Sequence, residues 1–194
     1  MSTTRLLMVL LAIVGYGSIA AQEPSEREVA KAEERANERQ ETLMMAEATI
    51  MRLRQEAPDS GALIDKAYGY AVFDATKGGF IVSGAGGKGV AQRQGGLEPV
   101  FMRMRSVGIG LTAGGESYKL VILLENQAAY DEFLEGQRSF KGSAQAVAGD
   151  AAASTAMHFE DGVAVYHLSD KGLLGNIDMS SVKFSKDDDL NERV

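Results

Sequence analysis

The chain has 194 residues, of which 45% are hydrophobic and 24% charged, and its formal net charge is −7 at pH 7. This composition is typical of a globular domain and excludes disorder throughout, and the acidic balance argues against nucleic acid as a partner. Because the chain has no cysteine, disulfides, thiolate metal sites and a cysteine nucleophile are excluded as well.

Residues 1–21 have the layout of a secretory signal peptide. Arg5 precedes an apolar run over 6–14, and small residues follow up to Ala20 and Ala21. The apolar run is too short to span a bilayer, so cleavage is expected near Ala20 or Ala21. An uncleaved membrane anchor is the alternative. The mature chain is therefore expected in the periplasm or outside the cell.

A long helix is predicted from Ser25 to about Gln55, within an N-terminal helical segment over residues 22–62. Ser25 and Glu28 have the spacing of a capping box. One apolar stripe at three- and four-residue steps is expected to dock on the rest of the domain; it consists of Leu43, Ala46, Ile50, Leu53 and Ala57. The methionines at 44, 45 and 51 are expected to widen this stripe, with a membrane- or partner-binding face as the alternative.

From residue 63 to 194 the pattern changes mostly to period two, which predicts strands joined by turns. The expected strands lie at 70–75, 80–82, 99–106, 117–124 and 162–168, with a final strand pair or hairpin arm within 173–184. Residues 117–124 are expected at the centre of the sheet. A short helix is predicted after Asn126, ending at Gly136, and the charged tail over 186–194 is expected to fray.

These elements predict an α+β fold. A long N-terminal helix would pack on a twisted, mostly antiparallel sheet, with one further inserted helix. Closure of the sheet into a barrel-like shape is left open. Arg103 and Arg105 alternate with methionines in the strand at 99–106 and are expected to face water or a ligand.

Eight glycines lie between residues 78 and 96. Glycine at this density in an extended segment indicates bulges, bends, or close approach of another backbone or a ligand. Gly84, Gly86 and Gly89 satisfy the G-x-G-x-x-G pattern of dinucleotide sites, but the helix and the acidic residue that such a site also needs do not follow.

No other motif predicts a metal site or catalysis. His158 and His167 lack the spacing of zinc ligands. The acidic residues 187–189 with Glu192 do not have the spacing of a calcium loop. Since no nucleophile, base and orienting group can be named together, we expect a protein that is not an enzyme and that needs no cofactor or metal.

Several short motifs occur in a fixed order over residues 63–191: Lys66 to Phe73, Lys77 to Phe80, Gly84 to Val90, and then Tyr166, Ser169, Lys171 to Leu173, and Asn191. In this order and spacing the chain resembles the SYLF domain, also called the Ysc84 or DUF500 family, and is similar to its exported bacterial members. The resemblance implies a mixed α+β module that binds lipid, with phosphoinositide-membrane association in eukaryotic members and actin binding in yeast-type members. By position it implies roles for Lys77, Gly79, Phe80, Gly84, Gly89, Lys171 and Gly172.

Basic residues gather near the glycines, at positions 77, 88, 93, 103 and 105. If they converge, they would hold an anionic head group against exposed backbone N–H groups, while Phe80 or methionine side chains meet acyl chains. Ordinary solvated charges are the alternative. The candidate lipid-binding set is Lys77, Gly79, Phe80, Gly84, Lys88, Gly89, Arg93, Lys171 and Gly172. We therefore predict non-catalytic binding of an anionic lipid or membrane surface in the cell envelope; the alternative is an envelope protein–protein interaction or scaffolding module.

Overall fold

The computed structural model describes residues 25–78, 82–96, 98–109, 116–137, 158–170, 172–174 and 181–192. The predicted signal peptide, Gly79, Phe80, residues 138–157 and Lys171 lie outside these residues. The elements in chain order are α1 (Glu26–Glu56), α2 (Ser60–Lys66), β1 (Gly69–Gly78), β2 (Val82–Arg93), β3 (Val100–Ile109), β4 (Glu116–Leu124), α3 (Gln127–Leu134), β5 (Val163–Ser169), β6 (Gly172–Leu174), β7 (Val182–Lys186) and α4 (Asp188–Asn191).

The strands form one seven-stranded sheet in the order β6-β5-β4-β1-β2-β3-β7, and every pairing is antiparallel. The predicted α+β class is confirmed. The sheet is open, with β6 and β7 at opposite edges, so barrel-like closure is wrong. Of the final strand pair or hairpin arm that the sequence predicts, the pair is wrong, because β6 and β7 do not lie side by side; β6 is instead the arm of a hairpin with β5. The centre of the sheet is β1 rather than β4.

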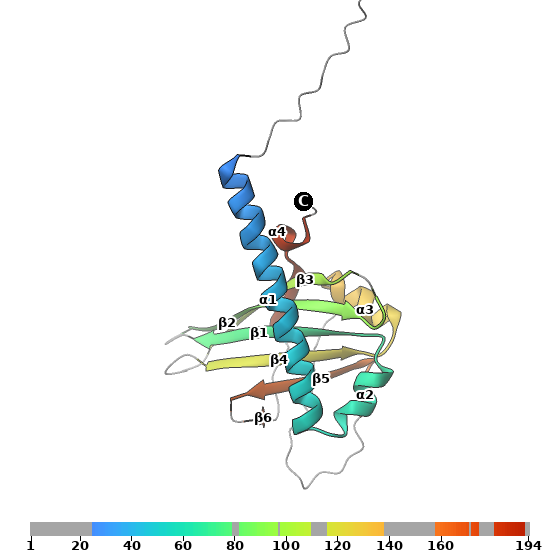
Figure 1. The fold of residues 1–194 in the computed structure, drawn as a ribbon. Helices are drawn as coiled ribbons and strands as arrows, with labels where there is room; N and C mark the ends of the chain where they lie inside the picture. The colour runs from blue at the N-terminus through green and yellow to red at the C-terminus, as the bar shows by residue number, and fades with distance from the viewer. Residues whose placement is uncertain are drawn as a thin grey trace, which may run out of the picture.

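Helix α1 crosses one face of the sheet, and its N-terminal part extends past the strands (Figure 1). It begins at a capping box in which Ser25 and Glu28 bond reciprocally, as predicted. Its buried side chains share one core cluster with residues from five strands, α2 and α4. On the sheet this cluster includes Val72, Val90, Phe101, Val121 and Leu123.

The rotation of α1 on the sheet differs from the prediction. Ala46, Leu53 and Ala57 are buried as expected, but Thr42 and Thr49 are buried too, and each hydroxyl donates to the carbonyl of the residue four positions earlier, which satisfies it. This rotation turns Met44 and Met51 outward, where they are 52% and 59% exposed. The prediction that these two methionines widen the core stripe is wrong.

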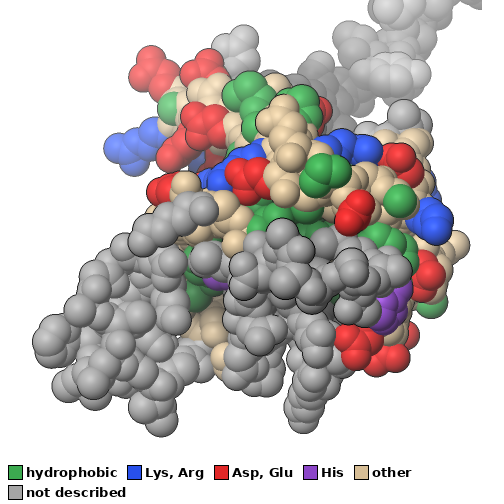
Figure 2. Space-filling model, turned by 90° about the horizontal axis from the view of Figure 1, so that it is seen from below, with side chains coloured by type: hydrophobic (Ala, Val, Ile, Leu, Met, Phe, Trp, Pro, Cys, Tyr) green, Lys and Arg blue, Asp and Glu red, His purple; other side chains and the backbone are tan. Residues whose placement is uncertain are grey.

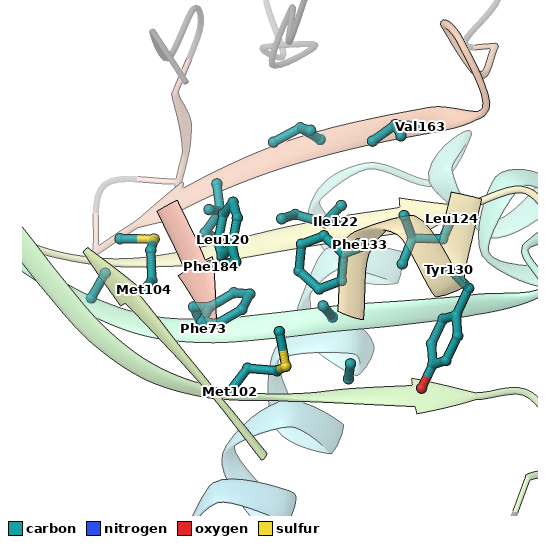
Figure 3. Packing of buried hydrophobic residues seen from close by; sticks show 14 of the residues in the cluster. Phe73, Met102, Met104, Leu120, Ile122, Leu124, Tyr130, Phe133, Val163 and Phe184 are labelled. Carbon is teal, nitrogen blue, oxygen red and sulfur yellow. The ribbon is translucent and has the colours of Figure 1, made fainter. Parts of the chain in front are cut away.

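The opposite face of the sheet packs against α3. Figure 3 shows Phe133 from α3 and Phe184 from β7 beside Phe73 of β1. The ring centroids of Phe73 and Phe184 lie 4.9 Å apart, and those of Phe133 and Phe184 lie 5.0 Å apart. Asn126 caps α3 through its side chain, which accepts from the N–H of Ala129 at 3.0 Å. The predicted inserted helix is confirmed.

The acidic C-terminal segment is ordered rather than frayed through Glu192. Asp187 is 1% exposed and caps α4. The side chain of Asn191 accepts from the N–H of Phe101 at 2.9 Å and donates to its carbonyl at 2.7 Å. These bonds attach the C-terminal segment to β3. The segment lies beside β3 because β7, which precedes it in the chain, pairs with β3.

Candidate anion-binding site

The glycines of β2 have two different environments, because successive residues of a strand face opposite sides of the sheet. A Cβ at Gly87 would lie 2.5 Å from the carbonyl oxygen of Asp74, and one at Gly89 would lie 2.3 Å from that of Val72. These two glycines permit close approach of β1. A Cβ at Gly86 would meet no heavy atom within 4 Å. Gly86 therefore leaves backbone open on the face that α1 partly covers.

Strand register places two polar rows on that open face, beyond the apolar residues that α1 covers. We call the row nearer α1 the inner row; it consists of Lys119, Asp74, Lys88, Arg103 and Ser185 on β4, β1, β2, β3 and β7. The next row, the outer row, consists of Ser117, Thr76, Gly86, Arg105 and Lys183 on the same strands. The two rows bring together residues from five separate strands of the chain.

Each cation of the inner row has an acidic partner. Lys119 pairs with Asp74 at 2.5 Å, and Lys88 forms an ion pair with Glu38 of α1. Arg103 donates to both carboxylate oxygens of Asp187, at 2.6 and 3.1 Å. The inner row is therefore neutralised within the chain.

Burial by itself raises the pKa of Asp187, but several favourable contacts more than offset it. Hydrogen bonds from Arg103 and from the N–H of Leu190, with the positive charges of Arg103 and Lys88, leave the pKa of Asp187 below its ordinary value of 3.8. The same hydrogen bond and charge raise the pKa of Arg103. Both groups remain charged at neutral pH.

The two cations of the outer row, Arg105 and Lys183, differ from those of the inner row because neither has an acidic partner among the described residues. Arg105 and Lys183 are both exposed and lie directly opposite each other across β3 and β7. Like charges in this position destabilise a sheet pair. Beside them is a cavity of about 430 Å³ lined by Gly86, Gly87, Lys88, Arg103 and Arg105 together with Asp74 and Met104. This arrangement suits an anion supplied from outside the chain.

The face seen from below is not uniformly cationic. Its described part carries both acidic and basic side chains (Figure 2). Arg105 and Lys183, which have no acidic partner in the described ranges, are thus a local feature that the formal net charge of −7 conceals.

The structure brings together only part of the predicted site. Gly84 and Lys88 lie on the open side of β2, while Gly89 faces Phe73 in the core. Arg93 lies about 16 Å beyond Lys88 along β2. Its guanidinium donates to the hydroxyl of Tyr68 at 3.4 Å, and this hydrogen bond raises the pKa of Arg93.

The remaining predicted residues lie elsewhere. Gly172 is on β6, four strands from β2 and hence about 19 Å away. The backbone of Lys77 lies opposite Ala85 in the β1–β2 register. The structure does not describe the side chain of Lys77, nor Gly79, Phe80 and Lys171. Lys183 was not predicted. The V-K-F-S-K alternation of β7 marks it as outward-facing, but only the β3–β7 register places it opposite Arg105.

In the described part of the chain, no helix has the length and apolar character needed to cross a membrane. The same residues contain no group of three or more histidine, cysteine and acidic side chains placed to hold a metal ion.

The fold defines a single-sheet α+β protein that has two exposed cations, Arg105 and Lys183, opposite each other at one end of the sheet face. Residues 105–194 match the family model Ysc84, described as Las17-binding protein actin regulator. The chain is also 35% identical over 148 residues to Beta cell expansion factor A of Aeromonas veronii, a match that covers 76% of the chain and 57% of that relative. The chain spans little more than half of the relative's length. Through these similarities the chain belongs to the Ysc84 (SYLF) family.

Proposed function

We propose that this protein binds anionic lipid or membrane surfaces without catalysis, through the outer row and the adjoining cavity. The observation that carries the proposal is the direct opposition of Arg105 and Lys183 with no acidic partner among the described residues. An external anion would relieve their repulsion. A flat, exposed row suits a surface of many head groups better than it suits one enclosed small molecule.

The proposal extends to where the protein acts. The predicted signal peptide over residues 1–21 supports a periplasmic or secreted protein of the cell envelope, where anionic membrane surfaces are accessible. The absence of a recognisable nucleophile, base and orienting group in the sequence supports a binding role. Neither nucleic acid nor a cofactor has a place in this proposal.

The first prediction concerns Arg105 and Lys183. The double variant R105Q/K183Q is expected to bind phosphatidylcholine vesicles containing phosphatidylglycerol about 30-fold more weakly than the wild type, because each cation near an anionic surface contributes about 1 kcal/mol. Co-sedimentation at low ionic strength measures the affinity. Added salt is expected to weaken wild-type binding as it screens the charges.

The matched control is K66Q/K186Q, which removes two exposed lysines, one on α2 and one on the face of β7 opposite to Lys183. It has the same net charge as R105Q/K183Q and is expected to bind nearly as well as the wild type. If the two double variants lose binding equally, the site assignment is wrong. If the wild type binds neither neutral nor anionic vesicles, the proposed function is wrong.

A second function, an envelope protein–protein interaction or scaffolding role, is supported by the outer surface of α1. Met44 and Met51 lie about two helical turns apart and expose 52% and 59% of their surface. Exposed methionines are common on adaptable binding surfaces. Cross-linking in envelope extracts tests this alternative: a stoichiometric protein partner that M44Q/M51Q loses, with vesicle binding unchanged, would favour it.

A further inference from the structure

The N-terminal half of α1 places an acidic surface directly beside the cationic rows. A groove of about 690 Å³ lies between this half-helix and the sheet. Its charged lining is almost wholly acidic and consists of Glu33, Glu34, Glu38, Glu41, Asp74 and Lys88. The only described cation of the groove, Lys88, is also part of the cationic cavity on the other side.

Lys88 is therefore shared between two neighbouring cavities of opposite charge. On one side its ammonium group forms an ion pair and hydrogen bond with the carboxylate of Glu38. On the other side it lines the cavity with Arg103 and Arg105. The Glu38 carboxylate is 29% exposed and the Lys88 side chain 59% exposed, so an external anion that reaches Lys88 meets an ammonium group whose charge Glu38 already balances.

This half of α1 is attached mainly by polar contacts. No residue of α1 before Thr42 is buried. Arg39 donates to the carbonyl oxygens of Leu190 and Glu192, at 2.7 and 2.6 Å, and Arg35 pairs with Glu192 at 2.9 Å. Arg35 is 17% exposed and its partner Glu192 62% exposed. Separation of the half-helix from the sheet would break these polar contacts but uncover no buried residue of α1, because burial begins at Thr42.

We propose that the N-terminal half of α1, residues 26–41, is autoinhibitory: its Glu38 forms the ion pair with Lys88 that an external anion would otherwise form. We call this half-helix the strap. The inference rests on the proposed function, since it concerns regulation of that same site. An anionic surface must displace Glu38 from Lys88, and repulsion between the surface and the glutamates of the strap adds to that requirement. Displacement frees Lys88 to join Arg105 and Lys183 in binding.

The test compares E38Q with E34Q in binding to phosphatidylglycerol-containing vesicles. Both variants remove one negative charge from the same groove, but Glu34 has no ion pair among the described residues. E38Q is expected to bind about 3-fold more tightly than the wild type, and E34Q less than about 1.5-fold, because an exposed pair is worth about 0.2–1 kcal/mol. In a K88Q background the effect of E38Q should vanish, as a double-mutant cycle requires.

A second measurement follows the strap itself. The chain has no cysteine, so A36C/A128C places spin labels on α1 and α3 alone, at exposed positions outside the rows and the groove lining. The distance between them should lengthen when phosphatidylglycerol-containing vesicles are added and stay constant with phosphatidylcholine alone. If the wild type binds anionic vesicles while E38Q matches E34Q and the distance is unchanged, autoinhibition is wrong and the proposed function stands. If no variant binds any vesicle, both are overturned.

Discussion

Replacing Gly89 by valine is expected to lower the free energy of unfolding by about 3 kcal/mol, at the upper end of the cost of overpacking a core. A Cβ at this position would lie 2.3 Å from the carbonyl oxygen of Val72 and 2.5 Å from Cδ1 of Phe73. Both contacts belong to β1, the central strand, and Phe73 is fully buried. Neither can move without disturbing the sheet. Guanidinium denaturation followed by far-ultraviolet circular dichroism measures the loss.

Gly86→Val is the control for Gly89→Val in the same strand. A Cβ at Gly86 would meet nothing within 4 Å, so its effect on stability is expected to stay within about 0.5 kcal/mol. Because Gly86 lines the cationic cavity, the folded variant is expected to bind anionic vesicles less well. Equal destabilisation by both substitutions would contradict the division of the glycines into two environments.

Replacing Asp187 by alanine is expected to cost about 2 kcal/mol of the free energy of unfolding. Losing one partner of a fully buried ion pair costs about 3–5 kcal/mol, but Arg103 is 39% exposed and can return to water, which reduces the penalty. The substitution also removes the side-chain cap of α4. Asp188→Ala, which alters an exposed neighbour in the same turn, serves as the control and is expected to change stability little.

The contribution of Asp187 should depend on pH in a defined direction. Its pKa in the folded chain lies below the ordinary value of 3.8, so below that value the unfolded chain binds more protons at this site than the folded chain does. The stability that its charge supplies is therefore fully present above 3.8 and is lost as the pH falls through the folded pKa. The stability difference between the wild type and Asp187→Asn, which can still cap α4, should shrink correspondingly. A difference that does not change on acidification would contradict this assignment.

Local features of the sequence were sufficient to predict several elements. The Ser25 and Glu28 pair predicts the start of α1, and Asn126 predicts the start of α3, because a capping bond joins residues only three positions apart. Alternation in β3 likewise predicts that Met102 and Met104 lie in the core while the arginines between and after them face outward.

The site required information that such patterns do not contain. Lys183 faces Arg105 only because β7 pairs with β3 in one particular register, and a shift of one residue would turn Lys183 to the other side of the sheet. The predicted Gly172 and Arg93 are separated from Lys88 by strand order and by distance along β2. Residues 79–81 and Lys171 lie outside the described residues, so their predicted roles stay predictions.

The sequence by itself determined the α+β class, the long capped helix and the two faces of each strand, since these follow from local hydrogen bonding and hydrophobic period. Only the tertiary structure decided the rotation of α1, which buries Thr42 and exposes Met44, and the burial of Asp187 beneath Arg103. It also decided which cations keep an acidic partner. These features depend on contacts between distant parts of the chain, whose geometry is set by packing and strand register rather than by neighbouring residues.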